Sequence, residues 1–214
     1  MADFFLRRKM RVYLLCLCSC IFLLSGCSTK EPLPPQKEIA QIKDDMPKRK
    51  EIVANALKHK DKKDGGDCSG FVSLVNKESG FPYFSVAELN EHFEDTRRSL
   101  AIYNLLESHN LLHYEKPTIG DLIFFANTVK KYAKGKGVDN ITHIGIVTKI
   151  DADETVHFLH HTKGKNLMGY MNLSQPKLAI SNGKTINSYM EKCSISQSHE
   201  CLAPSYFSAF GRLQ

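Results

Sequence analysis

The sequence has no tryptophan, no internal repeat and no long hydrophobic run. The lack of a repeat of fixed period excludes solenoid and propeller architectures. The longest apolar stretch, residues 12–24, is too short to cross a bilayer comfortably as the helix of a mature protein. A large excess of positive charge is also lacking beyond the N-terminus. The formal net charge is +6, but residues 1–26 carry four basic residues against one acid, which leaves +3 for the rest. We therefore expect no nucleic-acid partner.

The N-terminal residues have the pattern of an export signal: a basic segment, then a short apolar stretch. The stretch ends in "LLSGC", which resembles the lipobox of bacterial lipoproteins. That resemblance implies cleavage before Cys27 and lipidation of its thiol. We therefore expect residues 1–26 to be a lipoprotein signal peptide, and the protein to be exported and lipid-anchored to a bacterial membrane, facing the periplasm. The alternative is an ordinary secretory signal, or a membrane anchor with a chance cysteine.

Beyond the predicted signal peptide, cysteine is rare, with only Cys27, Cys68, Cys193 and Cys201. Thiols outside the cytoplasm tend to oxidise. Cys193 and Cys201 would close a short loop near the C-terminus, so we expect a disulfide between them, with two free thiols as the alternative. Cys68 would then remain as a free thiol.

The remaining chain divides into a tether and one domain. Residues 27–45 are polar, contain three prolines and show no apolar periodicity, which predicts an extended tether. The domain is expected over residues 46–214, with its first helix starting at Pro47. A chain of this length is sufficient for one hydrophobic core.

The domain changes character halfway along. Its first half has helical periodicity, including a helix that opens at Cys68 with Asp67 as N-cap and a capping box of Ser85 and Glu88. Its second half has short β-branched and aromatic runs bounded by turn residues, "DLIFFAN", "THIGIVTKI", "TVHFLHH" and "SYFSAFGRL". Helices followed by an antiparallel sheet predict an α+β fold.

Cys68 lies in "GDCSGF", where it would be the first residue of a helix. The unpaired N–H groups and the dipole of a helix N-terminus favour a negative charge there, which lowers the pKa of a thiol. The same N–H groups can stabilise an oxyanion. A cysteine packed as a small hydrophobic residue is the alternative.

A thiol nucleophile needs a base, and the predicted strands carry histidines. His143 lies in "THIGIV", and "VHFLHH" offers His157, His160 and His161. Strand alternation places His160 on one face and the other two on the opposite face. A base oriented by a third polar group is the arrangement of catalytic triads.

The series "DCSGFV", "GDLIFF", "THIGIV" and "FLHH" resembles the NlpC-type cell-wall cysteine peptidases, a papain-like clan. The resemblance covers residues 48–214. It implies a papain-like α+β fold with N-terminal helices packed on an antiparallel sheet. It also implies catalytic roles for Cys68 as nucleophile, His143 as base and His160 as orienting residue, with Asp67 and Ser69 binding the free amine of the substrate.

Members of this family cleave peptidoglycan stem peptides, typically at the γ-D-glutamyl–diaminopimelate bond, so that is the activity we expect, without a metal or cofactor. We expect the protein to act as a monomer whose partners are peptidoglycan peptides and, through the N-terminal lipid, the membrane. One departure is that the family's aromatic run and tyrosine before the cysteine are replaced by "KHKDKKDGGD"; Tyr83 could substitute for that tyrosine.

Two further functions stay open. A non-catalytic murein-binding or assembly lipoprotein on the same fold is compatible with the missing tyrosine. A zinc hydrolase using "HFLHH" is the third reading, which no helical histidine pair with a suitably spaced glutamate supports.

Overall fold

The computed structural model describes residues 36–129, 137–191 and 199–214. The predicted α+β class is confirmed, with helices packed on a six-stranded antiparallel sheet. The predicted signal peptide, Cys27 and Cys193 lie outside the described residues, so lipidation and the disulfide of Cys193 with Cys201 stay predictions. Within the described ranges, no helix is long and apolar enough to cross a membrane.

The helices precede most of the strands along the chain. The α-helices are α1 (Gln36–Lys58), α2 (Cys68–Glu78), α3 (Val86–Asn90) and α4 (Arg98–Ser108). The strands of the main sheet are β1 (Leu112–His113), β2 (Leu122–Ala126), β3 (Ile141–Ile150), β4 (Val156–Thr162), β5 (Lys165–Met171) and β8 (Phe207–Gly211). A small hairpin of β6 (Ile180–Ser181) and β7 (Lys184–Thr185) and a 3-10 helix, η2 (Ala203–Ser205), come between β5 and β8.

Two helices begin where the sequence predicts. Asp67 caps α2, because its side chain accepts a hydrogen bond from the Gly70 N–H at 2.7 Å. Ser85 and Glu88 form the predicted capping box at the start of α3. Both signals are local, since each needs only side chains and N–H groups within one turn.

The predicted start of the first helix at Pro47 is wrong, because α1 begins at Gln36 and runs through this proline. The prediction of an extended tether therefore fails for residues 36–45. Proline removes one backbone hydrogen bond and is most common in the first turn of a helix, so its presence alone predicts a helix start. The helix continues through Pro47 because its C-terminal half is anchored in the core by Ile52 and Ala56.

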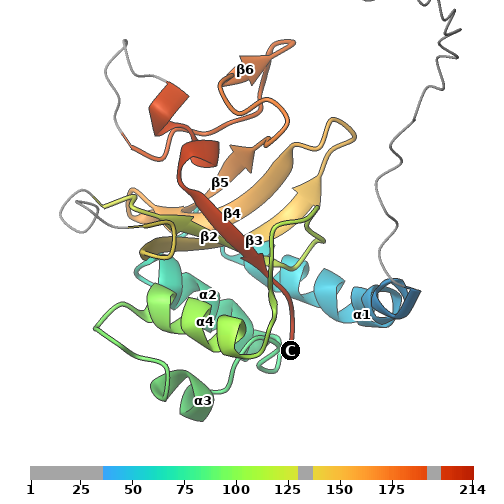
Figure 1. The fold of residues 1–214 in the computed structure, drawn as a ribbon, viewed down its shortest axis with the longest axis vertical. Helices are drawn as coiled ribbons and strands as arrows, with labels where there is room; N and C mark the ends of the chain where they lie inside the picture. Colours follow the sequence, from blue (N-terminus) through green and yellow to red (C-terminus); the bar gives the residue numbers. More distant parts are fainter. Residues whose placement is uncertain (1–35, 130–136, 192–198) are drawn as a thin grey trace, which may run out of the picture.

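The main sheet has strand order β1-β8-β2-β3-β4-β5, and both of its faces are covered. Figure 1 shows α2, α3 and α4 together on one side of the sheet and the β6–β7 hairpin on the other. Phe124 and Ile144 pair across β2 and β3 and pack against the helices. Phe125 and Phe158 belong to the core of the opposite face. Burial on both faces explains why "LIFFA" is continuously apolar instead of alternating.

A buried ion pair joins α1 to the start of the sheet. Arg49 donates to Asp121 Oδ1 at 2.6 Å, and both side chains are almost fully buried. Beside them the hydroxyl of Tyr83, which is itself fully buried, donates to the Gly120 carbonyl. Tyr83 is therefore a core residue whose hydroxyl is bound beside the Arg49–Asp121 pair.

Candidate active site

Cys68 is the first residue of α2, and its side chain is half-buried at the surface of the helix-side core. The N-cap, Asp67, has an extended backbone, and its carboxylate also accepts a hydrogen bond from the Ser69 hydroxyl at 2.9 Å. Burial alone would raise the pKa of Asp67. Hydrogen bonds from Gly70 and Ser69 and the charge of Arg98 lower it instead. Asp67 is therefore a carboxylate next to the thiol at neutral pH.

The sulfur of Cys68 lies against the edge of β3. The backbone N–H of Ile144 forms a hydrogen bond to it. On the β2 side of the same strand, Val147 donates its N–H to Asp121, so alternation directs the N–H of Ile144 toward β4. The ladder of β3 with β4 begins only at the pair Ile146–Leu159. The Ile144 N–H therefore has no partner in the β3–β4 ladder and can donate to the Cys68 sulfur. Ile144 directly follows His143 in the chain.

His143 and His160, which the sequence singled out as base and orienting residue, are in direct contact. His143 Nε2 and His160 Nδ1 lie 2.6 Å apart, with the two rings nearly perpendicular at 86°. The ring of His160 also packs edge-on against Phe158, and that of His143 against Phe125. Aromatic packing on the sheet face therefore holds both imidazoles in place.

The contact between the two histidines determines where the protons can be. One of the two nitrogens must donate and the other must accept. If His143 donates from Nε2 to His160 Nδ1, the Nδ1 of His143 is left with a free lone pair. This is the arrangement a general base needs, because His160 then stabilises the tautomer of His143 and the cation that forms when Nδ1 takes a proton.

The other histidines of β4 have different partners. His157 Nε2 lies 2.8 Å from the carboxylate of Asp151, and His161 Nδ1 lies 2.8 Å from the side-chain oxygen of Asn166. Of the three histidines in "VHFLHH", only His160 contacts His143. Within the part of the chain that the structure describes, no group of three or more histidine, cysteine, aspartate or glutamate side chains is placed to hold a metal ion. The imidazoles of His157, His160 and His161 do not point to one common centre, as a zinc site built from them would require.

Burial shifts Cys68 and His143 toward their neutral forms. It raises the pKa of the Cys68 thiol to about 11, although the N–H of Ile144 acts in the opposite direction. Burial, with a smaller contribution from the charge of His161, lowers the pKa of His143 to about 4. Burial is also the main reason that the pKa of His160 lies well below its ordinary value. At neutral pH Cys68 is therefore a thiol and His143 a neutral imidazole, rather than a thiolate and an imidazolium.

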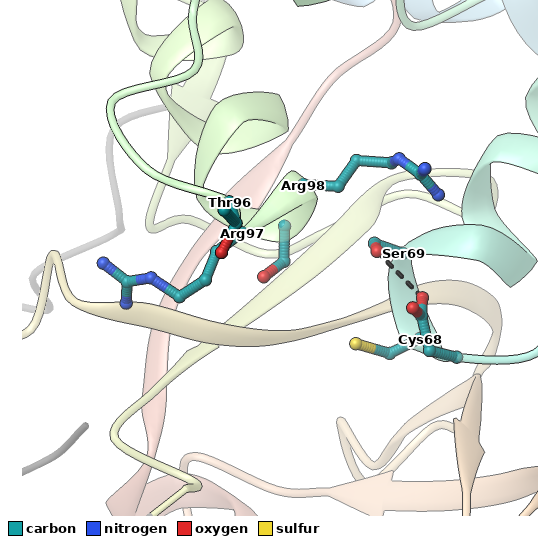
Figure 2. Close-up of a pocket in the computed structure, with 7 residues that line it drawn as sticks. Cys68, Ser69, Thr96, Arg97 and Arg98 are labelled. Atoms are coloured by element: carbon teal, nitrogen blue, oxygen red, sulfur yellow. Dashed lines mark hydrogen bonds between the residues drawn. The ribbon is translucent and has the colours of Figure 1, made fainter. Parts of the chain in front are cut away.

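A pocket of about 250 Å³ opens in front of the thiol. The residues that line it come from the start of α2 and from the start of α4. They are Asp67, Cys68, Ser69, Thr96, Arg97, Arg98 and Ser99. Figure 2 shows the sulfur of Cys68 directed toward the residues that precede α4. It also shows Arg98 extending toward the start of α2, whereas Arg97 extends away. Arg97 instead donates to Asn140 Oδ1 at 2.7 Å and to the Ile141 carbonyl at 3.2 Å, which ties this wall to β3.

The sequence alone does not single out the arginines of this wall or Asn166. Arg97 and Arg98 form a basic pair at the start of a helix, which by itself is an ordinary surface feature. Their position opposite Cys68 comes from the packing of α4 beside α2. Asn166 follows a turn in "HHTKGKN", which is the composition of a loop, and only its contacts distinguish it.

Comparison of the chain with known proteins found no matching family model, no similar curated protein and no similar solved structure.

Proposed function

We propose that this protein is a cysteine hydrolase with a papain-like active site, in which Cys68 is the nucleophile, His143 the base and His160 the orienting residue. The observation that carries the proposal is the 2.6 Å contact between His143 Nε2 and His160 Nδ1, on a strand whose next residue, Ile144, donates its N–H to the sulfur of Cys68 at a helix N-terminus. The proposed substrate is a peptidoglycan stem peptide, cleaved at its γ-D-glutamyl–diaminopimelate bond. This substrate class follows from the resemblance of the sequence motifs to the NlpC-type peptidases.

In the proposed mechanism the resting thiol is activated as it attacks. The Cys68 sulfur bonds to the carbonyl carbon of the scissile amide while its proton passes to Nδ1 of His143. The carbonyl electron pair moves to oxygen, and the N–H of Cys68 at the start of α2 stabilises this oxyanion. Collapse breaks the C–N bond, and the leaving amine takes the proton from His143.

The second half of the reaction releases the acyl group. Water attacks the thioester and gives a proton to Nδ1 of His143. The C–S bond then breaks, the product leaves as a carboxylic acid, and the thiol is restored. A neutral His143 can take the proton in both halves, which agrees with its low pKa of about 4. Throughout the cycle, His160 accepts the Nε2–H of His143 and stabilises the cation.

The pocket offers charges of both signs to the substrate. Asp67 is a carboxylate that can bind the free amine of a stem peptide, with the Ser69 hydroxyl beside it. Arg98 lies on the opposite wall, close enough to lower the pKa of Asp67, and can pair with a carboxylate of the substrate. An amine and a carboxylate occur together in stem peptides. The location that we propose is the periplasmic side of a bacterial membrane, with Cys27 lipidated.

The test is digestion of purified murein by the full chain in detergent micelles, followed by mass spectrometry of the released muropeptides. Cys68→Ala and His143→Gln should each reduce cleavage by about 10³-fold or more, because the nucleophile or its base is lost. His157→Gln is the matched control, since this histidine lies on β4 but pairs with Asp151, and it should keep activity. Undiminished cleavage by a folded Cys68→Ala variant would end the proposal.

The second candidate is a murein-binding or assembly protein without catalysis. The observation that favours it is the pKa of about 11 for Cys68, since a thiol so rarely ionised is a poor nucleophile without an effective base. This candidate predicts that the wild-type chain sediments with murein sacculi and releases no muropeptide. If the protein is a hydrolase, the digest should contain murein fragments, and their new ends identify the bond that was cut.

A further inference from the structure

The loop that leads to the nucleophile has no apolar side chain with which to pack. Residues 60–67 are "KDKKDGGD", and nearly all of them are exposed. A loop of this composition cannot be held by hydrophobic contacts, so its conformation depends on hydrogen bonds from neighbouring elements. It ends at Asp67 and Cys68, two residues of the proposed site.

One buried residue on β5 supplies most of these hydrogen bonds. Asn166 is fully buried. Its side-chain nitrogen donates to the carbonyls of His59 at 3.0 Å and Asp64 at 3.1 Å. Its main chain adds two more bonds, since its N–H donates to the Lys62 carbonyl and its own carbonyl accepts from the Asp61 N–H, each at 2.8 Å. Asn166 therefore binds the loop at both of its sides and along its middle.

His161 determines which way the amide of Asn166 is turned. Because both donated bonds use the Asn166 nitrogen, the side-chain oxygen must be the atom that lies 2.8 Å from His161 Nδ1. An amide oxygen only accepts, so His161 Nδ1 must carry the proton and donate. His161 is itself buried, and without its donor the Asn166 oxygen would be a buried acceptor with a lost partner.

We propose that Asn166 and His161 are positioning residues that hold the loop before the nucleophile, and through it Asp67 and Cys68, in the arrangement that the reaction needs. Neither residue touches the thiol in this role; they act through the backbone of residues 59–64. The importance of the arrangement for catalysis rests on the proposed function, but the clamp itself is testable without any murein cleavage.

The decisive comparison is between His161→Asn and His161→Gln in the full chain. The amide nitrogen of asparagine can take the place of Nδ1, whereas that of glutamine corresponds to Nε2. His161→Asn should therefore keep the hydrogen bond to Asn166, and His161→Gln should lose it. Two readouts apply: hydrogen exchange of peptides that cover residues 59–67, and the rate at which iodoacetamide alkylates Cys68 at pH 9.

We expect His161→Gln to speed exchange in the loop by about tenfold, as the loss of a net hydrogen bond implies, and to change the alkylation rate of Cys68. His161→Asn should leave both near the wild-type values, and exchange within α2 should be unchanged in both variants. A folded Asn166→Ala variant should show faster hydrogen exchange in the loop than His161→Gln does. Equal exchange in the asparagine and glutamine variants would overturn the clamp. If the clamp behaves as expected but wild-type protein cleaves no murein, the proposed function fails and the clamp stands.

Discussion

The protonation state of Cys68 and His143 distinguishes two forms of the proposed mechanism, general-base transfer and a preformed ion pair. Both groups are partly removed from water, and burial shifts the thiol pKa up to about 11 and the imidazole pKa down to about 4. The two shifts have the same consequence, because each favours the uncharged form. The helix N-terminus and the Ile144 N–H favour the thiolate but do not overcome this desolvation. General-base transfer during attack therefore fits the site better than a preformed ion pair.

These pKa values predict the pH profile of Cys68 alkylation in the absence of substrate. Only the thiolate reacts, so between pH 7 and pH 10 the iodoacetamide rate should rise about tenfold for each pH unit. Peptide-resolved mass spectrometry can follow Cys68 separately from the other cysteines. A rate plateau between pH 5 and pH 8 would contradict the prediction, since it would reveal a thiolate stabilised by an imidazolium. His143→Gln should not change the slope.

At the scale of elements, the start of α2 and the loop before it are packed backbone against backbone. Gly65 has φ of +86°, and a Cβ there would overlap the Cα and N of Phe71. A Cβ on Gly70 would overlap the Gly65 carbonyl oxygen. The next glycine in the loop, Gly66, also has positive φ, +75°, but open space around it. The two glycines of the pair before the cysteine are therefore needed for different reasons.

This difference can be measured with two alanine variants. Gly66→Ala should lower the free energy of unfolding only by the cost of a left-handed backbone with a Cβ, about 1–2 kcal/mol. Gly65→Ala adds an overlap with backbone atoms that cannot rotate away, which costs about 1–3 kcal/mol more. Urea unfolding of both variants gives the free energies of unfolding. Equal losses in the two variants would show that the loop and the start of α2 are not in close contact.

At the scale of the whole molecule, the fold places two neutral histidines in the sheet. Burial lowers the pKa of both His143 and His160 below the value of about 6.5 expected in the unfolded chain. As pH falls below about 6.5, the unfolded chain takes up protons at these positions and the native protein does not. The unfolded state is therefore favoured progressively, until pH reaches the folded-state values.

The free energy of unfolding should accordingly be lower at pH 5 than at pH 7, by about 2 kcal/mol for each of the two histidines. His59 acts in the opposite sense: burial lowers its pKa, but hydrogen bonds to Asp64 and Glu78 raise it overall, so its stabilisation is present below about pH 6.5 and is lost as pH rises. Urea titrations at both pH values, on the wild type and on a His143→Gln/His160→Gln variant, test this. The double variant should lose most of the decrease, and an equal decrease in both proteins would refute the assignment.

How far the sequence predicts this molecule depends on the range of each interaction. Asp67 was predicted to cap α2, and Ser85 with Glu88 to form a capping box, because these contacts span one turn. Strand β5 was not predicted, because Gly169 interrupts its pattern. A Cβ at that position would overlap the Phe158 ring on the neighbouring strand. The glycine is thus required by a contact that only the sheet creates.

The sequence by itself determined the fold class and the place of Cys68 at a helix start, because these follow from local periodicity, and the resemblance of its motifs to the NlpC-type peptidases selected His143 and His160 as candidates. The tertiary structure decided that His160, rather than His157 or His161, meets His143, because strand register brings side chains from distant residues together. It also decided that Arg98 faces the thiol and that Asn166 holds the loop. Both residues lie far along the chain from the groups they meet, Arg98 from Cys68 and Asn166 from residues 59–64, so only the tertiary structure brings them together.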